Sequence, residues 1–161
     1  MRNAITIQHE PRGLAYKELV SRSLRHADTL LLVTRHSIDI GPSALETLER
    51  LRPFTIGQHE ASEWPGTRLF EHTATLYTIR LLPEVAAIMT EKARGLFDWT
   101  QPWLPEDPCL LRPDGSPWLV TISHEKDAYL SLSSEERETL LAGSPNLASV
   151  LGPPQPAFGD P

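Results

Sequence analysis

The second half of the chain carries three residue types that can perform nucleophilic catalysis, Cys109, His124 and Asp127. A cysteine nucleophile needs a histidine base within hydrogen-bond reach and a third group that orients the base. These three residues supply those types, and His72 is a further possible base. If the chain is an enzyme, we expect its catalytic residues among these four.

The spacing of these residues argues against a catalytic triad. Asp114-Gly115, flanked by apolar runs, predicts a hairpin turn that places Cys109 opposite Leu119 or Val120. His124 would then lie about four residues further along, roughly 13 Å away, well beyond hydrogen-bond reach. We therefore predict a buried, inert thiol. A small hydrolase or transferase, with a site built from dispersed residues around His124, remains the alternative function.

Histidines and carboxylates could also form a zinc site. His124-Glu125 begins like the zinc motif H-E-x-x-H, but the position of the second histidine is Ala128, and the segment has the pattern of a strand and turn. A site assembled from His59, His72 and His124 with a carboxylate is the remaining way to bind zinc. We predict no metal and no cofactor.

Tryptophans and carboxylates lie close together in a proline-rich segment. Glu106 and Asp107 stand between two prolines, which predicts a rigid, solvated acidic loop, and Trp99 and Trp103 precede them. Large aromatic residues beside fixed charges are typical of protein interfaces, although the tryptophans could instead cap the core. The candidate partner-binding residues are Trp99, Trp103, Glu106, Asp107, Asp114, Glu125 and Asp127.

The net charge of −6 is concentrated in the second half of the chain. Residues 1–95 carry 12 Lys and Arg against 11 Asp and Glu, whereas residues 96–161 carry 3 against 10. A nucleic-acid binder needs a basic stripe to contact phosphates, so nucleic acid is disfavoured as a partner. A basic partner protein fits the acidic half.

A local basic surface is predicted on the first helix, over residues 13–27. Its apolar residues fall on one arc at 100° per residue. The opposite arc, with Lys17, Arg22 and Arg25, is net positive and is either a solvated surface or a docking face.

The pattern of apolar residues predicts an α+β domain over residues 1–143. We expect an antiparallel or mixed sheet that includes a three-stranded meander over 108–132 and a central strand at 28–34. About three to four helices should pack against it, near 14–27, 42–51 and 83–94, with a short helix after the capping box of Ser133 and Glu136. Residues 144–161, which are rich in proline, are expected to form an extended or disordered tail.

These features favour a small cytoplasmic protein-binding module over an enzyme. The single cysteine fits a reducing compartment, and neither a signal peptide nor a membrane span is indicated. An acidic neutralising protein, of the kind exemplified by bacterial immunity and antitoxin proteins, or an adaptor would bind a basic partner. A subunit of a homo-oligomer, joined through the same aromatic residues, is a third possibility.

Overall fold

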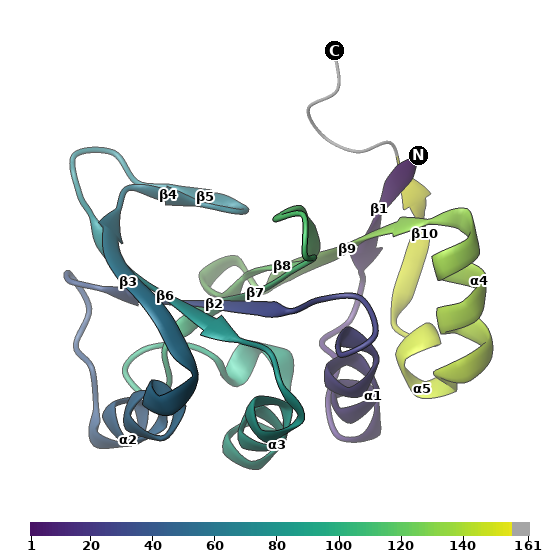
Figure 1. Cartoon of the computed structure of the whole chain (residues 1–161). Coiled ribbons are helices and arrows are strands. Elements are labelled where there is room, and N and C mark those ends of the chain that lie inside the picture. The colour runs from purple at the N-terminus through teal and green to yellow at the C-terminus, as the bar shows by residue number, and fades with distance from the viewer. Residues whose placement is uncertain (156–161) are drawn as a thin grey trace.

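The computed structural model describes residues 1–155, which form an eight-stranded antiparallel sheet with four main helices packed against it (Figure 1). The α+β fold class is confirmed. The strand order is β10-β1-β9-β8-β7-β2-β6-β3. These strands are β1 (Arg2–Ile7), β2 (Thr29–Arg35), β3 (Thr55–Ala61), β6 (Ala74–Arg80), β7 (Glu106–Leu111), β8 (Pro117–Ile122), β9 (Asp127–Ser133) and β10 (Leu151–Gln155).

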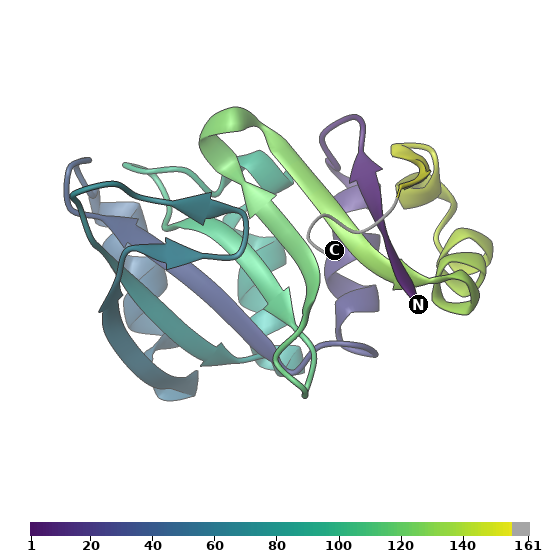
Figure 2. The same ribbon diagram turned by 90° about the horizontal axis from the view of Figure 1, so that it is seen from above.

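Helices and a small hairpin cover opposite faces of this sheet (Figures 1 and 2). The helices are α1 (Leu14–Ser23), α2 (Pro42–Leu51), α3 (Pro83–Lys92), α4 (Ser134–Gly143) and the short α5 (Pro145–Ala148), with 3₁₀ turns η1 (Arg52–Phe54), η2 (Leu96–Asp98) and η3 (Ser123–Glu125). The hairpin consists of β4 (Glu63–Trp64) and β5 (Thr67–Arg68). Among the helices of residues 1–155, none has the length and hydrophobicity that crossing a membrane requires.

Strand β2 is buried on both faces, as its nearly continuous apolar sequence predicts. Leu30 and Leu32 pack into the main core under the helices. Leu31 and Val33 belong to two smaller clusters on the hairpin side. Because successive side chains of a strand point to opposite faces, only a strand covered on both sides buries all four.

The tip of the β4–β5 hairpin lies directly against the sheet. Gly66 has φ +87°, and a Cβ at this position would lie 2.7 Å from Cγ1 of Val120 in β8. A glycine is therefore required here both for the turn and for the close approach.

The predicted meander is confirmed as strands β7, β8 and β9. Leu110 pairs with Leu119, and the two turns contain Gly115 at φ +85° and Lys126 at φ +52°. The helices predicted near 14–27, 42–51 and 83–94 correspond to α1, α2 and α3. The capping box at the start of α4 is also present, since Ser133 Oγ accepts a hydrogen bond from the Glu136 amide at 3.1 Å.

Residues 145–155 differ from the expected tail. They form α5 and β10, and β10 pairs with β1 at the edge of the sheet. Leu147 is fully buried in the main core, which explains why the segment returns to the domain. The rest of the predicted tail, 156–161, lies outside the described residues.

Candidate functional site

Two adjacent carboxylates, Glu106 and Asp107, are completely buried where β7 begins, with 0% of either residue exposed. The prediction of a solvated acidic loop is therefore wrong for these residues. They lie in a strand between β2 and β8, where neighbouring chain segments exclude water. They are the centre of a polar cluster, which we call the buried network: Arg35, Trp64, Gln101, Glu106, Asp107, Ser123 and His124.

Asp107 forms three hydrogen bonds with two other segments of the chain. Trp64 Nε1 donates to Oδ2 at 2.9 Å, and the Ser123 amide donates to Oδ1 at 2.8 Å. The Asp107 amide in turn donates to Ser123 Oγ at 3.2 Å. Asp107 has φ +52°, a left-handed conformation that costs about 1 kcal/mol outside glycine. These hydrogen bonds offset that cost and join the hairpin to the end of β8.

Glu106 contacts one permanent cation and one histidine. Arg35 Nε lies 3.1 Å from Oε2, His124 Nε2 lies 2.8 Å from Oε1, and the Gln101 amide donates to Oε1 at 3.1 Å. Arg35 Nε and Glu106 Oε2 are close enough for an ion pair, but they are not aligned for a hydrogen bond. Among residues 1–155, neither of these two atoms has a hydrogen-bond partner. Burial raises the pKa of Glu106, although the Gln101 amide, His124 and Arg35 oppose this rise.

Arg35 also contacts the second carboxylate and an aromatic ring. Its Nη2 lies 3.5 Å from Asp107 Oδ2, and its Cζ lies 5.6 Å from the centre of the Trp64 ring. The guanidinium of Arg35 therefore contacts both buried carboxylates and also makes a cation–π contact with Trp64.

Gln101 fixes the loop that follows η2. Its Oε1 accepts from the Arg35 amide at 2.6 Å, and its Nε2 donates to the carbonyls of Arg35 and Ile38 at 3.1 and 3.0 Å. This loop carries Trp103, whose side chain is 69% exposed, while Leu104 next to it is buried.

A hollow of about 490 Å³ lies beside the exposed Trp103. Phe97, Lys92 and Lys126 contribute to its walls, and η2 and η3 lie close together here. Lys92 Nζ pairs with Glu46 at 2.8 Å, so the lysine of α3 is already neutralised. The hollow thus combines apolar and charged side chains.

The seven predicted partner-binding residues do not form one surface. Trp99 is fully buried, and its Nε1 donates to the Tyr16 hydroxyl at 3.0 Å, so it caps the core. Asp114 is exposed at the turn between β7 and β8, whereas Glu125 and Asp127 are exposed at the other end of β8. A strand of six residues spans roughly 20 Å. Trp103, Glu125 and Asp127 are the candidates that remain exposed at one end of the sheet.

The predicted catalytic residues also remain apart. Cys109 is fully buried beside Leu31 and Val120, and its burial raises the pKa of the thiol to about 12. Its Sγ–H donates to the carbonyl of Pro65 at 3.7 Å. His124 is 40% exposed and bonds to Glu106, so it is the partner of neither Cys109 nor Asp127. The thiol cannot act as the nucleophile in this structure.

His72 and His59 are exposed on the loop before β6 and on β3. Within residues 1–155, no three His, Cys, Asp or Glu side chains are arranged to bind a metal ion. The zinc site considered from the sequence is not assembled in this part of the chain.

The sequence does not single out four members of the buried network, namely Arg35, Trp64, Gln101 and Ser123. An arginine as the last residue of the apolar strand β2 was a weak signal, because a charged side chain at the end of a buried strand often contacts the ends of neighbouring strands. No sequence pattern pairs it with Glu106. Comparisons with protein families, with curated proteins and with solved structures found no match.

Proposed function

We propose that this chain is a protein-binding module that binds a basic partner protein through the Trp103 surface, defined as Trp103, Glu125 and Asp127. One observation carries the proposal: a tryptophan that is 69% exposed stands at the rim of a hollow of about 490 Å³. Exposed tryptophans beside hollows are the residues that most often dominate binding energy at interfaces.

The loop that presents Trp103 is held in place, which lowers the entropic cost of binding. The amides of Trp103 and Leu104 both donate to the Thr100 carbonyl at 3.1 Å. Gln101 ties the same loop to the end of β2. A side chain on a fixed loop loses little freedom when a partner covers it.

The charge of the chain supports a basic partner. Glu125 and Asp127 are exposed, and within residues 1–155 neither forms an ion pair with a basic side chain. The chain as a whole carries −6. Glu125 and Asp127 flank Lys126, which lines the hollow, and give this turn a net negative charge that would steer a positively charged protein and make its association rate depend on salt.

The proposal is tested by affinity capture from a lysate of the source organism with wild-type protein and Trp103→Ala. Phe70→Ala is the matched control, because Phe70 is a second aromatic residue that is 76% exposed. We expect one stoichiometric basic protein with wild type and with Phe70→Ala, and loss of it with Trp103→Ala. Equal capture by all three proteins would contradict the proposal.

The double change Glu125→Lys and Asp127→Lys tests the electrostatic part. Both residues are exposed, so the fold should persist. We expect the partner to be lost or bound without its salt dependence. If capture and salt dependence stay unchanged, the carboxylates play no part in binding.

A second candidate function, a small hydrolase or transferase, is favoured by the His124–Glu106 pair. A half-exposed imidazole oriented at 2.8 Å by a buried carboxylate is an arrangement that serves general base catalysis. Activity against a panel of esters and acyl donors that is lost in His124→Ala but kept in His72→Ala would support it. If the wild-type protein shows no activity against this panel, the second candidate function is contradicted.

A further inference from the structure

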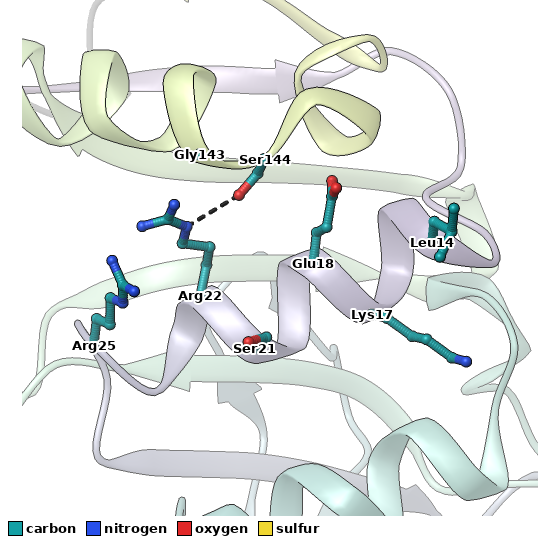
Figure 3. Close-up of a pocket in the computed structure, with 8 residues that line it drawn as sticks. All are labelled: Leu14, Lys17, Glu18, Ser21, Arg22, Arg25, Gly143 and Ser144. Carbon is teal, nitrogen blue, oxygen red and sulfur yellow. Dashed lines mark hydrogen bonds between the residues drawn. The ribbon is translucent and has the colours of Figure 1, made fainter.

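We infer that the hollow between α1 and the α4–α5 turn binds the phosphate group of a small phosphorylated molecule. The hollow has a volume of about 370 Å³ and is lined by residues of α1, including Lys17 and Arg22, by Arg25 just after this helix, and by Gly143 and Ser144 (Figure 3). It lies apart from the buried network and the Trp103 surface, which share no lining residue with it.

Arg22 is fixed in position before any ligand arrives. Its Nε donates to Ser144 Oγ at 3.0 Å, and Ser144 itself is buried. Its guanidinium lies so close to Gly143 that a Cβ at this position would overlap Nη2. A guanidinium held this way needs little further ordering to bind an anion.

This guanidinium keeps donors that the protein does not use. A guanidinium has five N–H groups, and the contact with Ser144 uses one. Nη1 is closed to solvent and has no hydrogen-bond partner among residues 1–155, and Nη2, which lies beside Gly143 at the hollow, has none in this part of the chain either. An anion in the hollow could accept from the N–H groups of Nη2 and would stabilise the charge of the guanidinium. Phosphate oxygens match the paired donors of arginine.

The hollow keeps a net positive charge, because Lys17, Arg22 and Arg25 line it together with a single carboxylate, that of Glu18. In the described part of the chain, none of Lys17, Arg22 and Arg25 forms an ion pair. Glu18 also lines the hollow, but its two oxygens accept from Asn146 Nδ2 at 2.9 Å and from the Leu147 amide at 2.7 Å.

Two of these cations gather at one end of the hollow. Figure 3 shows Arg22 and Arg25 reaching toward the α4–α5 turn, whereas Lys17 extends the other way. Like charges that share a site repel each other, so a dianion between the two guanidinium groups would relieve this repulsion. The volume of the hollow is at the lower end of the range for small-molecule sites, which fits a compact phosphate ester.

The inference is tested by NMR titration of the full chain with inorganic phosphate, and in a second arm with glycerol 3-phosphate. Chloride at the same ionic strength is the reference. We expect saturable shifts of the Arg22 Nε–H signal and of the Gly143 and Ser144 amides. Arg22→Gln and Arg25→Gln should each weaken binding about tenfold, the loss that one charged hydrogen bond brings. Arg68→Gln, which removes the same charge from the β4–β5 hairpin, should leave the affinity unchanged.

The competing role for Arg22 is that of a cation at the C-terminal end of α4, which would stabilise that helix without any ligand. In that case chloride and phosphate would cause the same shifts, and this result would overturn the inference. Unchanged phosphate affinity in Arg25→Gln would also overturn it. Arg25 is exposed, so its replacement tests binding even if Arg22→Gln fails to fold. Tighter binding of glycerol 3-phosphate supports an ester as the ligand, and equal binding supports free phosphate.

Discussion

Glu106 and Asp107 place two carboxylates side by side in the interior, where each needs compensating contacts. Arg35 is the permanent cation that contacts both of them, at 3.1 and 3.5 Å. His124 and the amides of Gln101 and Ser123 supply further donors. Because breaking a buried ion pair leaves a charge without a partner, the contribution of Arg35 to stability should be large.

We expect Arg35→Met to lower the free energy of unfolding by about 3–5 kcal/mol, measured by chemical denaturation, since methionine keeps the apolar stem and removes the charge. Arg68→Met is the control, because Arg68 is exposed and its ion pair with Glu63 is 4.0 Å long. Its effect should stay within about 0.5 kcal/mol. A similar loss in both variants would show that the cation at 35 has no special role.

Cys109 should be chemically inert in the folded protein. The thiol is fully buried, and burial raises its pKa to about 12, so little thiolate exists at neutral pH. A thiol reagent should label Cys109 only as fast as the protein opens, and the rate should increase when denaturant is added. Labelling of the native protein as fast as a free cysteine would contradict its burial.

Glu136 should make the stability depend on pH in the acidic range. Burial opposes ionisation, but hydrogen bonds from Arg112 and from the Ser133 amide outweigh it and hold the pKa of Glu136 below its usual range. Its stabilising effect is therefore present above the unfolded pKa of about 4.3 and is lost as the pH falls through the lower folded value. His26 Nδ1 lies 3.2 Å from the same carboxylate.

The change Glu136→Gln isolates this contribution. We expect the variant to be less stable than wild type by about 1–3 kcal/mol at pH 7, and the difference to shrink toward pH 3. Denaturation curves recorded between pH 7 and pH 3 measure it. A difference that stays constant over this range would rule out the Arg112–Glu136 pair as its cause.

At the scale of elements, the loop between η2 and β7 connects the interior to the proposed binding surface. Gln101 makes three side-chain hydrogen bonds shorter than 3.2 Å to the end of β2 and the residues after it. Trp103 stands two residues later. Loss of the Gln101 side-chain amide should therefore loosen the loop between η2 and β7, while the residues of the Trp103 surface stay the same.

We expect Gln101→Ala to speed hydrogen exchange of residues 100–104 and 36–39, while the core strands stay protected. The stability should fall by about 1–3 kcal/mol, because the Arg35 amide loses its acceptor. Partner binding should weaken through the greater freedom of Trp103. Unchanged exchange in this loop would mean that other contacts hold it.

Several elements could be predicted from the sequence because their signals are local. The helix at 42–51 begins at a proline and has apolar residues at helical spacing, and the capping box of Ser133 and Glu136 marks the start of α4. The meander has its turn at Asp114-Gly115. In each case the residues that determine the element lie within a few positions of one another.

Other elements depend on distant partners and escaped prediction. Edge strand β10 contains two prolines and is ordered by pairing with β1, about 150 residues away in sequence. The burial of Glu106 likewise depends on Arg35, which lies on another strand. A carboxylate pair between prolines looks like a solvated loop unless the cation that neutralises it is known.

At the scale of the whole molecule, the described structure separates two charged regions. Arg22 of α1 and Arg25, just after this helix, line the hollow at the α4–α5 turn, whereas Glu125 and Asp127 flank Lys126, which lines the hollow of Trp103. The net charge of −6 is a sum over the chain and does not indicate that basic and acidic residues lie in separate regions. A basic protein at the Trp103 surface and a phosphate at α1 would use different lining residues, so each can be tested without disturbing the other.

The central claim, that Trp103 contacts a protein partner, is tested most directly by photocrosslinking in cells of the source organism. A photoreactive benzoylphenylalanine replaces Trp103 in one variant and Phe70 in the control. We expect one crosslinked protein of fixed mass from position 103, lost when Glu125 and Asp127 are changed to lysine, and none from position 70. No crosslink from position 103, or the same products from both positions, would contradict the claim.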